Sequence, residues 1–208
     1  MRPYVRTIEN VELDGGHLSI DFINTVRNRF EEPQHDYLQT SADLLKWCRR
    51  LDLLSEKTLS EVESNIASQP AQAEKQIKKV KDLREVLYEI FVSIAYNRVP
   101  KRNAVQRFNY HLAETWSNFI LDIREAKQVV PEWSHEHPEI LQCMDPIVKA
   151  AYELLMSSEL LKLKECGACG WLFLDKSKNQ SRRWCNMQTC GSSEKARNYY
   201  KKTKTKNS

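Results

Sequence analysis

The residues with the clearest chemistry are four cysteines near the C-terminus. They form two close pairs, Cys166-x2-Cys169 and Cys185-x4-Cys190, with fifteen residues between the pairs. Two pairs joined by a hairpin-sized insert supply the four thiolates of a tetrahedral zinc site. We therefore predict that Cys166, Cys169, Cys185 and Cys190 bind one structural Zn²⁺. Four protein ligands close the coordination shell, so the pattern does not favour a catalytic zinc.

The rest of the chain bears on the redox state of these thiols. No run of about 18 apolar residues is present, and residues 1–16 contain no apolar segment typical of a signal peptide. We therefore expect a cytoplasmic protein without a membrane span, whose cysteines stay reduced. A disulfide, a redox-active Cys-x-x-Cys and an iron–sulfur cluster are alternatives, but the paired spacing favours zinc. Cys48 and Cys143 stand alone and are interpreted as small buried apolar side chains.

Charge is distributed unevenly along the chain. The net charge is +4, but residues 160–208 contain 12 Lys and Arg against 3 Asp and Glu, a net of +9. The residues before them contain 20 basic and 25 acidic side chains, a net of −5. A mildly acidic body followed by a strongly basic C-terminal segment predicts an anionic partner for that segment.

The basic residues gather around the second cysteine pair. Ser192 or Ser193 is placed to cap a helix that begins just after Cys190. Lys and Arg on such a helix suit phosphates, and Asn or Arg can read base edges, which predicts a DNA-binding surface. The predicted contact residues are Arg182, Arg183, Lys195, Arg197, Asn198, Lys201 and Lys202. The alternative is a solvated basic helix that docks on an acidic protein.

The body that must position this segment is mostly helical by its apolar periodicity. Helices are predicted over about 42–51, capped by Ser41, and from a cap at Ser55 to a stop before Pro70. The longest covers about 72–97 and the next about 102–114, each with apolar residues three and four positions apart. A last helix is predicted over about 139–163, with Pro146 as a point of bending or restart and Asp145 as its candidate cap. It leads directly into Cys166, which predicts that the zinc segment sits on that helix.

Between the last two helices the apolar period changes to two. Phe119, Leu121 and Ile123 occupy alternate positions, and a second apolar run follows a polar break. This pattern predicts a short β-hairpin over about 118–133. The expected fold is therefore mainly α. A helical N-terminal domain with a short β-hairpin is followed by a small four-cysteine zinc finger and a basic helix.

The N-terminal stretch 15–26 opens with a glycine pair and continues with an apolar run. Its apolar residues recur at every fourth position, which favours a buried helix over a strand. Three polar residues share an adjacent face of that helix and, with His17, are candidates for lining a ligand pocket: Asp21, Asn24 and Thr25. The alternative is that they cap and brace the N-terminal elements through side-chain to backbone hydrogen bonds.

Both ends of the chain resemble a bacterial protein family. The stretches Cys166-Gly-Ala-Cys-Gly-Trp-Leu-Phe-Leu-Asp-Lys-Ser and Arg182-Arg-Trp-Cys-Asn-Met-Gln-Thr-Cys-Gly191 resemble the CGNR zinc finger. The stretch Gly15-Gly-His-Leu-Ser-Ile-Asp-Phe-Ile-Asn-Thr-Val26 resembles the opening of the ABATE domain that precedes that finger. The resemblance implies that the four cysteines ligate zinc and that Asp21, Asn24 and Thr25 match signature positions. It also implies a stress-induced transcription regulator whose finger binds DNA.

The chain departs from the family at the motif that names the finger. Cys-Gly-Asn-Arg is replaced by Cys190-Gly-Ser-Ser193. The cysteine ligand and the glycine remain, and serine caps a helix as well as asparagine does. The missing arginine removes a candidate phosphate contact. The zinc prediction is therefore unchanged, whereas the DNA-binding prediction is weakened.

These patterns predict three regions: an ABATE-like helical domain over 1–163, a CGNR-like zinc finger over 164–202 and a disordered basic tail over 203–208. The predicted function is a zinc-dependent, DNA-binding transcription regulator whose N-terminal domain senses a small-molecule effector or forms a homodimer. The alternative is an interaction module whose basic finger docks on an acidic protein. No P-loop, nucleophile elbow, dinucleotide fingerprint or metal-spaced histidine pair is present, so we do not expect an enzyme.

Overall fold

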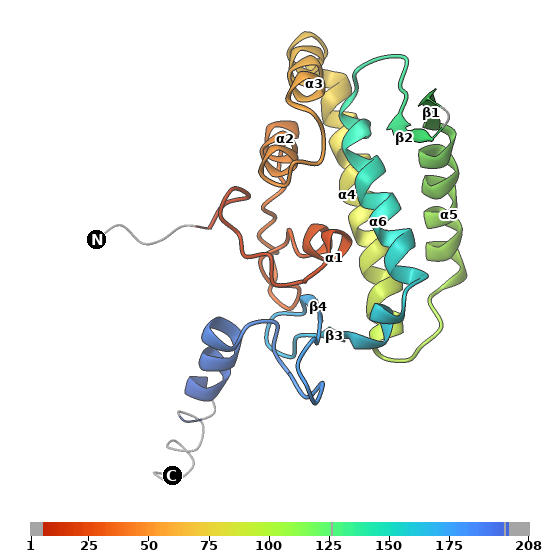
Figure 1. Cartoon of the computed structure of the whole chain (residues 1–208). Helices are drawn as coiled ribbons and strands as arrows, with labels where there is room; N and C mark the ends of the chain where they lie inside the picture. The colour runs from red at the N-terminus through yellow and green to blue at the C-terminus, as the bar shows by residue number, and fades with distance from the viewer. Residues whose placement is uncertain (1–5, 126, 198, 200–208) are drawn as a thin grey trace.

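The computed structural model describes residues 6–125, 127–197 and 199. Helices dominate this part of the chain, as the apolar periodicity predicted (Figure 1). The α-helices of the body are α1 (Leu18–Ile23), α2 (Ser41–Arg50), α3 (Glu56–Ser68), α4 (Pro70–Ala95), α5 (Arg102–Ser117) and α6 (Asp145–Leu155). None of the described helices combines the length and apolar character that crossing a bilayer needs.

The long helix α4 forms the centre of the body. It packs against α1, α3 and α5, and α6 packs against α1 and α5, so that α4, α5 and α6 lie side by side in Figure 1. The stripe predicted for α4 is its buried face, with Val80, Leu83, Leu87 and Phe91 fully enclosed. Burial of this stripe, rather than helix propensity, is the main source of its stability.

Two helix starts differ from the sequence prediction. The cap of α2 is Thr40 and not Ser41, because Thr40 Oγ1 accepts from Asp43 N (3.2 Å) and the Asp43 carboxylate accepts from Thr40 N (2.8 Å). This reciprocal pair satisfies two free N–H groups at once. Pro70 starts α4 instead of merely following α3, since proline fits the first helical turn, where its missing N–H costs nothing. Ser55 caps α3 as predicted.

The predicted hairpin is confirmed. Strands β1 (Phe119–Glu125) and β2 (Gln128–Trp133) pair antiparallel, with Phe119 opposite Trp133. Trp116, at the end of α5, packs edge-on against Phe119 at 5.2 Å between ring centroids and also contacts Trp133. These aromatic contacts fix the hairpin to the end of α5.

The segment predicted as a helix over 139–163 does not run as one helix into Cys166, although the restart at Pro146 is confirmed. The segment consists of a short 3-10 helix η1 (Ile140–Met144), then α6, then a second 3-10 helix η2 (Ser158–Lys162). Pro146 restarts the chain as a new helix at Asp145. Ser157 ends α6, because its backbone is extended and its hydroxyl donates to the Leu154 carbonyl (3.0 Å).

The zinc segment is joined to the body by a shared core. Strand β3 (Leu163–Glu165) precedes Cys166 and pairs antiparallel with β4 (Leu172–Leu174). The buried side chains Trp171, Leu172 and Phe173 belong to the same apolar cluster as Ile20 and Ile23 of α1. Figure 1 shows β4 just below α1, while β3 packs against α4. The finger is therefore docked on α1 through strands and does not continue the last body helix.

Candidate metal centre and the surface around it

The four cysteines converge on one point. Their Sγ atoms all lie within 4.8 Å of one another, with Cys169 to Cys185 at 3.8 Å and Cys185 to Cys190 at 3.7 Å. Zn–S bonds of about 2.3 Å in a tetrahedron place the sulfurs about 3.8 Å apart. The cluster therefore fits Zn²⁺, the cofactor of this protein, with Cys166, Cys169 and Cys185 buried and Cys190 partly exposed.

The turn between the first two cysteines depends on glycine. Gly170 has φ +72° and donates its N–H to the Cys166 carbonyl (2.9 Å), while Cys166 N donates to the Trp171 carbonyl (2.7 Å). A Cβ at Gly170 would lie 2.6 Å from Arg29 Cβ. The turn is also hydrogen-bonded to Arg29, whose backbone N–H donates to the Cys169 carbonyl (2.8 Å). Only glycine combines this backbone angle with this close approach to the body.

One cysteine of the second pair, Cys190, lies inside a helical segment, whereas Cys185 precedes it. A π-helical turn, η3 (Met187–Gly191), runs into an α-helical stretch over 192–197, so Cys190 is within the helix and does not precede it. Asn186 caps the segment, since its Oδ1 accepts from the N–H groups of Gln188 (2.8 Å) and Thr189 (3.3 Å). The predicted cap at Ser192 or Ser193 is therefore wrong. Ser192 instead donates its hydroxyl to the Met187 carbonyl (3.2 Å).

Asn24 joins α1 to the finger. Its Nδ2 donates to the Leu172 carbonyl (2.8 Å) and its Oδ1 accepts from Leu172 N (3.0 Å), in a setting where Asn24 is only 2% exposed. Beside it, Trp171 Nε1 donates to the Val26 carbonyl (2.5 Å). One side-chain amide thus satisfies both backbone groups of a finger residue, as a neighbouring strand would.

Asp21 holds the glycine turn that precedes α1. Its Oδ1 accepts from Gly15 N (2.8 Å), and the Gly15 carbonyl accepts from Leu174 N in the finger (3.0 Å). Burial raises the pKa of Asp21 to about 7, and the nearby Asp14 charge raises it further against the opposing Gly15 N–H. The Asp21 carboxyl is therefore a structural hydrogen-bond acceptor whose charged form is disfavoured by burial.

The other two candidates for a ligand pocket are also engaged within the protein. Thr25 Oγ1 donates to the Phe22 carbonyl (2.8 Å) and accepts from Arg84 (3.1 Å), and His17 Nδ1 lies 3.0 Å from Ser19 Oγ. This geometry corresponds to the bracing alternative for these residues. The cavity between α5 and α6 is lined by other residues.

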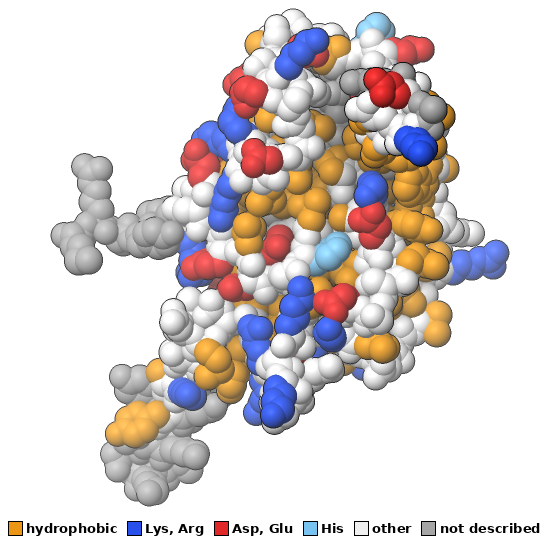
Figure 2. Space-filling view, viewed as in Figure 1, with side chains coloured by type: hydrophobic (Ala, Val, Ile, Leu, Met, Phe, Trp, Pro, Cys, Tyr) orange, Lys and Arg blue, Asp and Glu red, His pale blue; other side chains and the backbone are white. Residues whose placement is uncertain are grey.

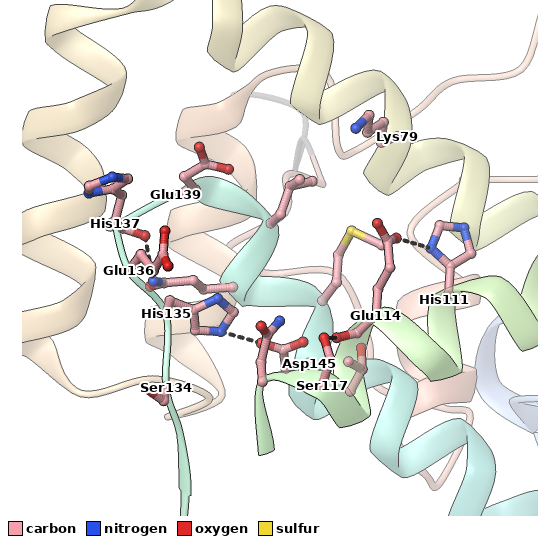
Figure 3. Close-up of a pocket in the computed structure, with 15 residues that line it drawn as sticks. Lys79, His111, Glu114, Ser117, Ser134, His135, Glu136, His137, Glu139 and Asp145 are labelled. Atoms are coloured by element: carbon pink, nitrogen blue, oxygen red, sulfur yellow. Dashed lines mark hydrogen bonds and ion pairs between the residues drawn. The ribbon is translucent and has the colours of Figure 1, made fainter. Parts of the chain in front are cut away.

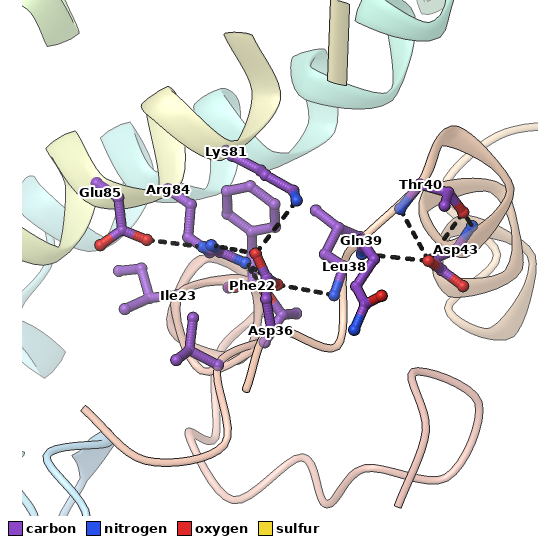
Figure 4. A network of polar contacts seen from close by, with 12 residues as sticks. Phe22, Ile23, Asp36, Leu38, Gln39, Thr40, Asp43, Lys81, Arg84 and Glu85 are labelled. Carbon is purple, nitrogen blue, oxygen red and sulfur yellow. Dashed lines mark hydrogen bonds and ion pairs between the residues drawn. The ribbon is translucent and has the colours of Figure 1, made fainter. Parts of the chain in front are cut away.

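A buried ion pair that the sequence analysis missed supports the same region (Figure 4). Arg84 of α4, 4% exposed, donates to both carboxylate oxygens of Asp36 at 2.7 and 2.9 Å. Burial alone would raise the pKa of Asp36, but the hydrogen bonds and charge of Arg84 hold that pKa below its ordinary value. The sequence contains one sign of this ion pair. Arg84 lies four residues after Val80 and three before Leu87, within the apolar stripe of α4, and a charge buried there requires a partner of opposite charge.

The loop between the cysteine pairs is organised by Asp175. This buried carboxylate accepts from Lys164 Nζ (2.7 Å), Ser177 Oγ (2.6 Å) and Arg182 N (2.9 Å). Burial alone would raise the pKa of Asp175, yet these donors hold it well below the usual range. The loop over 175–182 is thereby fixed ahead of the second cysteine pair.

The basic residues predicted to contact DNA differ in exposure and in their contacts within the protein. Arg182 is a structural residue, because its guanidinium lies 5.0 Å from the Phe173 ring centre and donates to the Cys185 carbonyl. Arg183, Lys195 and Arg197 are exposed, although Arg197 also pairs with Glu194 (2.8 Å). In Figure 2, blue side chains gather over the finger in the lower part of the view. The predicted contacts at Asn198, Lys201 and Lys202 and the predicted tail over 203–208 lie outside the described residues.

Fold and site together define a class: a helical body whose core includes a docked four-cysteine zinc finger. Residues 16–158 match the ABATE family model, described as "putative stress-induced transcription regulator", and residues 162–203 match the model of the CGNR zinc finger. The first match covers more than half of the chain, which therefore belongs to the ABATE family and carries a CGNR zinc finger. No match was found among curated proteins.

Proposed function

We propose that this protein is a DNA-binding transcription regulator and that its zinc finger contacts the phosphate backbone. The observation that carries the proposal is the exposure of Arg183, Lys195 and Arg197 around a segment held by two zinc ligands. The family description supports a regulatory role. Basic side chains on a rigid support suit a regular array of phosphates.

In this proposal some finger residues hold the backbone in place and others contact the phosphates. Zinc and the Asn186 cap fix the start of the helical segment, and Asp175 with Arg182 fixes the loop before it. Arg183, Lys195 and Arg197 then provide the phosphate contacts in the described part of the chain. Asn198, Lys201 and Lys202 continue the basic sequence and remain candidate contacts on the basis of the sequence alone.

The replacement of the family Asn-Arg by Ser192-Ser193 has a defined consequence. Ser192 bonds the helix backbone, and Ser193 is exposed next to the metal site. Neither serine is needed as a zinc ligand. We therefore expect normal zinc binding with one phosphate contact fewer than in a relative that has arginine at position 193.

The body is proposed to carry the regulatory signal in the cytoplasm, through a homodimer or a bound effector. Light scattering on the purified, zinc-loaded chain tests the first route, and a monomer at all concentrations contradicts it. No catalytic step is proposed, since both family descriptions concern regulation and metal binding.

DNA binding is tested on the full zinc-loaded chain by fluorescence anisotropy with random-sequence duplex DNA across a salt series. The triple variant Arg183→Ala, Lys195→Ala, Arg197→Ala should lower the slope of log K against log salt by about 3, since each phosphate contact contributes roughly 0.9. The matched control is a second triple variant in exposed body lysines, Lys57→Ala, Lys75→Ala, Lys101→Ala, and should leave the slope unchanged.

Selection from genomic fragments completes the test. We expect the wild-type chain to enrich a sequence motif, which would separate a specific regulator from a general basic surface. No retention of DNA at low salt, or equal losses in the two triple variants, contradicts the proposal. The first of these results would instead favour docking of the finger on an acidic protein.

A further inference from the structure

A cavity lies in the body, beside α5 and the start of α6 (Figure 3). It is a half-open hollow lined by α5, by the segment 134–139, by η1 and by the start of α6, and its volume is about 550 Å³. Cavities of about 300 to 1,000 Å³ are typical of small-molecule sites. Neither zinc binding nor the proposed DNA contacts use any of its residues.

The charge lining this cavity is negative. Four carboxyl groups, those of Glu114, Glu136, Glu139 and Asp145, are opposed by the single ammonium of Lys79. Figure 3 shows these carboxyl groups and three histidines around the hollow. Burial lowers the pKa of one of them, His111, which favours its neutral form. An excess of carboxylate charge favours a cationic ligand.

An unused hydrogen-bond acceptor gives independent support. Gln142 lines the cavity and is 6% exposed, and its Nε2 donates to the His137 carbonyl (3.1 Å), which fixes the orientation of the amide. Gln142 Oε1 is then a buried acceptor without a partner in the described residues. His111 Nδ1 likewise has no hydrogen bond there, with Glu114 Oε2 at 3.9 Å. Buried acceptors left without donors are costly, so a ligand with N–H groups would be favoured.

The arrangement suits an organic cation better than a metal ion. Among the described residues, the only cluster with metal-ligand atoms close enough together is that of the four cysteines. Leu141 and Met144 supply an apolar wall in the cavity. Asp145 is also held in place, since its Oδ2 lies 2.6 Å from His135 Nε2. The site therefore offers the Gln142 acceptor, a negative field and a surface for a short hydrocarbon chain, with His111 Nδ1 as a second atom unpartnered in the described part of the chain.

We propose that this cavity binds a small organic cation, an amine or guanidine that carries several N–H donors on a short aliphatic chain. An N–H of the ligand bonds Gln142 Oε1, and its charge is balanced by Glu114, Glu136 and Asp145. The aliphatic part lies against Leu141 and Met144. Binding here does not depend on whether the finger contacts DNA, so the two proposals fail separately.

Isothermal titration calorimetry on the full zinc-loaded chain, without DNA, tests the inference. The probes share one carbon skeleton and differ in charge: 1,5-diaminopentane, 1,5-pentanediol and glutarate, with n-butylguanidine as a second cation. We expect one saturable site for the diamine or the guanidine, and binding at least about tenfold weaker for the diol and the dianion.

Variants locate the site. Glu114→Gln with Glu136→Gln removes two exposed charges at the rim of the cavity without emptying the core and should weaken cation binding about tenfold. Gln142→Met removes the unpartnered acceptor and should weaken it to a similar extent. Glu153→Gln on α6, outside the cavity and paired with Lys149, is the control and should bind as wild type.

Three outcomes would overturn the inference. One is the absence of saturable cation binding up to about 10 mM. Another is glutarate binding as tightly as the diamine. The last is equal affinity in wild type and in the Glu114 and Glu136 double variant, with the fold of that variant verified by circular dichroism.

Discussion

At the scale of single residues, Asn24 connects the two ends of the chain. Its amide makes both hydrogen bonds that Leu172 would otherwise make to a neighbouring strand. The two residues are separated by 148 positions. Because both groups are buried, no water replaces the amide when it is removed.

Replacing Asn24 should therefore destabilise the whole protein. Asn24→Ala leaves the buried N–H and C=O of Leu172 without partners, and we expect the free energy of unfolding to fall by about 2–4 kcal/mol. Guanidinium unfolding followed by tryptophan fluorescence measures the change. Asn103→Ala, at an exposed position on α5, is the control and should change stability by less than about 0.5 kcal/mol. Equal effects of the two substitutions would contradict this account.

Asp21 makes stability depend on pH. Its folded-state pKa of about 7 lies above the ordinary value of 3.8, because burial disfavours the charged form. The folded state thus holds the proton more tightly, so this contribution is complete below about pH 3.8 and is lost as the pH rises through about 7. Asp21→Asn keeps the acceptor for Gly15 N and removes the charge.

The variant should consequently be more stable than wild type at pH 8, by more than about 1 kcal/mol, and nearly equal to it at pH 4. Thermal unfolding at both pH values provides the comparison. A constant difference across the pH range would show that the Asp21 carboxyl is not the group that titrates.

How far the sequence predicts the site is clearest at this scale. The metal site can be predicted from the spacing of the four cysteines, because a local turn brings the two members of each pair together. The partner of Asn24 is not contained in any local pattern, because a pairing over 148 positions depends on the docking of the finger. Arg84 shares this property, because its partner Asp36 lies 48 positions away in another part of the chain.

At the scale of elements, the finger turn is a close fit to the segment after α1. Gly170 has a positive φ and lies against Arg29. Gly167, in the same turn, has room for a side chain, because a Cβ there would lie 4.0 Å from its nearest neighbour, the Arg183 carbonyl oxygen. The two glycines form a matched pair for mutagenesis. They differ in contact with the body, not in distance from the metal ligands.

Gly170→Ala should lower stability by at least about 2 kcal/mol, because strain at positive φ adds to the clash with Arg29. Gly167→Ala should cost less than about 1 kcal/mol. Thermal unfolding of the zinc-loaded variants, with zinc content measured by a colorimetric chelator, separates loss of docking from loss of metal. If both alanines are equally harmful, the turn matters for zinc binding rather than for docking.

Element types followed from the sequence more reliably than element ends. The stripe of α4 and the alternation in β1 are strong periodic signals and were predicted correctly. The end of α6 was not predicted, because Leu155 to Lys162 keeps helical apolar spacing while Ser157 turns the backbone locally. The cap at Asn186 was missed for a similar reason, since Ser192 and Ser193 offered an equally good sequence signal.

At the scale of the whole molecule, zinc supports the body as well as the finger. Cys166, Cys169 and Cys185 belong to the same apolar cluster as the residues of α1 and α4. A metal bound only to the folded state stabilises every element that unfolds with it. Loss of zinc should thus reach the helical core.

We expect removal of zinc by a strong chelator at neutral pH to lower the unfolding temperature of the body, monitored by far-UV circular dichroism of the helices. Re-addition of one equivalent of Zn²⁺ should restore it. Cys166→Ser should resemble the chelated protein and should bind less than one zinc per chain. An unchanged helical transition in the metal-free protein would mean that finger and body unfold independently.

The distance along the chain between Asn24 and Leu172 also sets when the protein can finish folding on the ribosome. Trp171 and Leu172 are synthesised 145 and 148 residues after their hydrogen-bond partners Val26 and Asn24. Until they leave the exit tunnel, the backbone of Val26 and the amide of Asn24 have no partner from the finger. The nascent helical body therefore stays incomplete until β3 and β4 have emerged and the metal is bound, and a message truncated before Cys166 should yield a chain that chaperones retain.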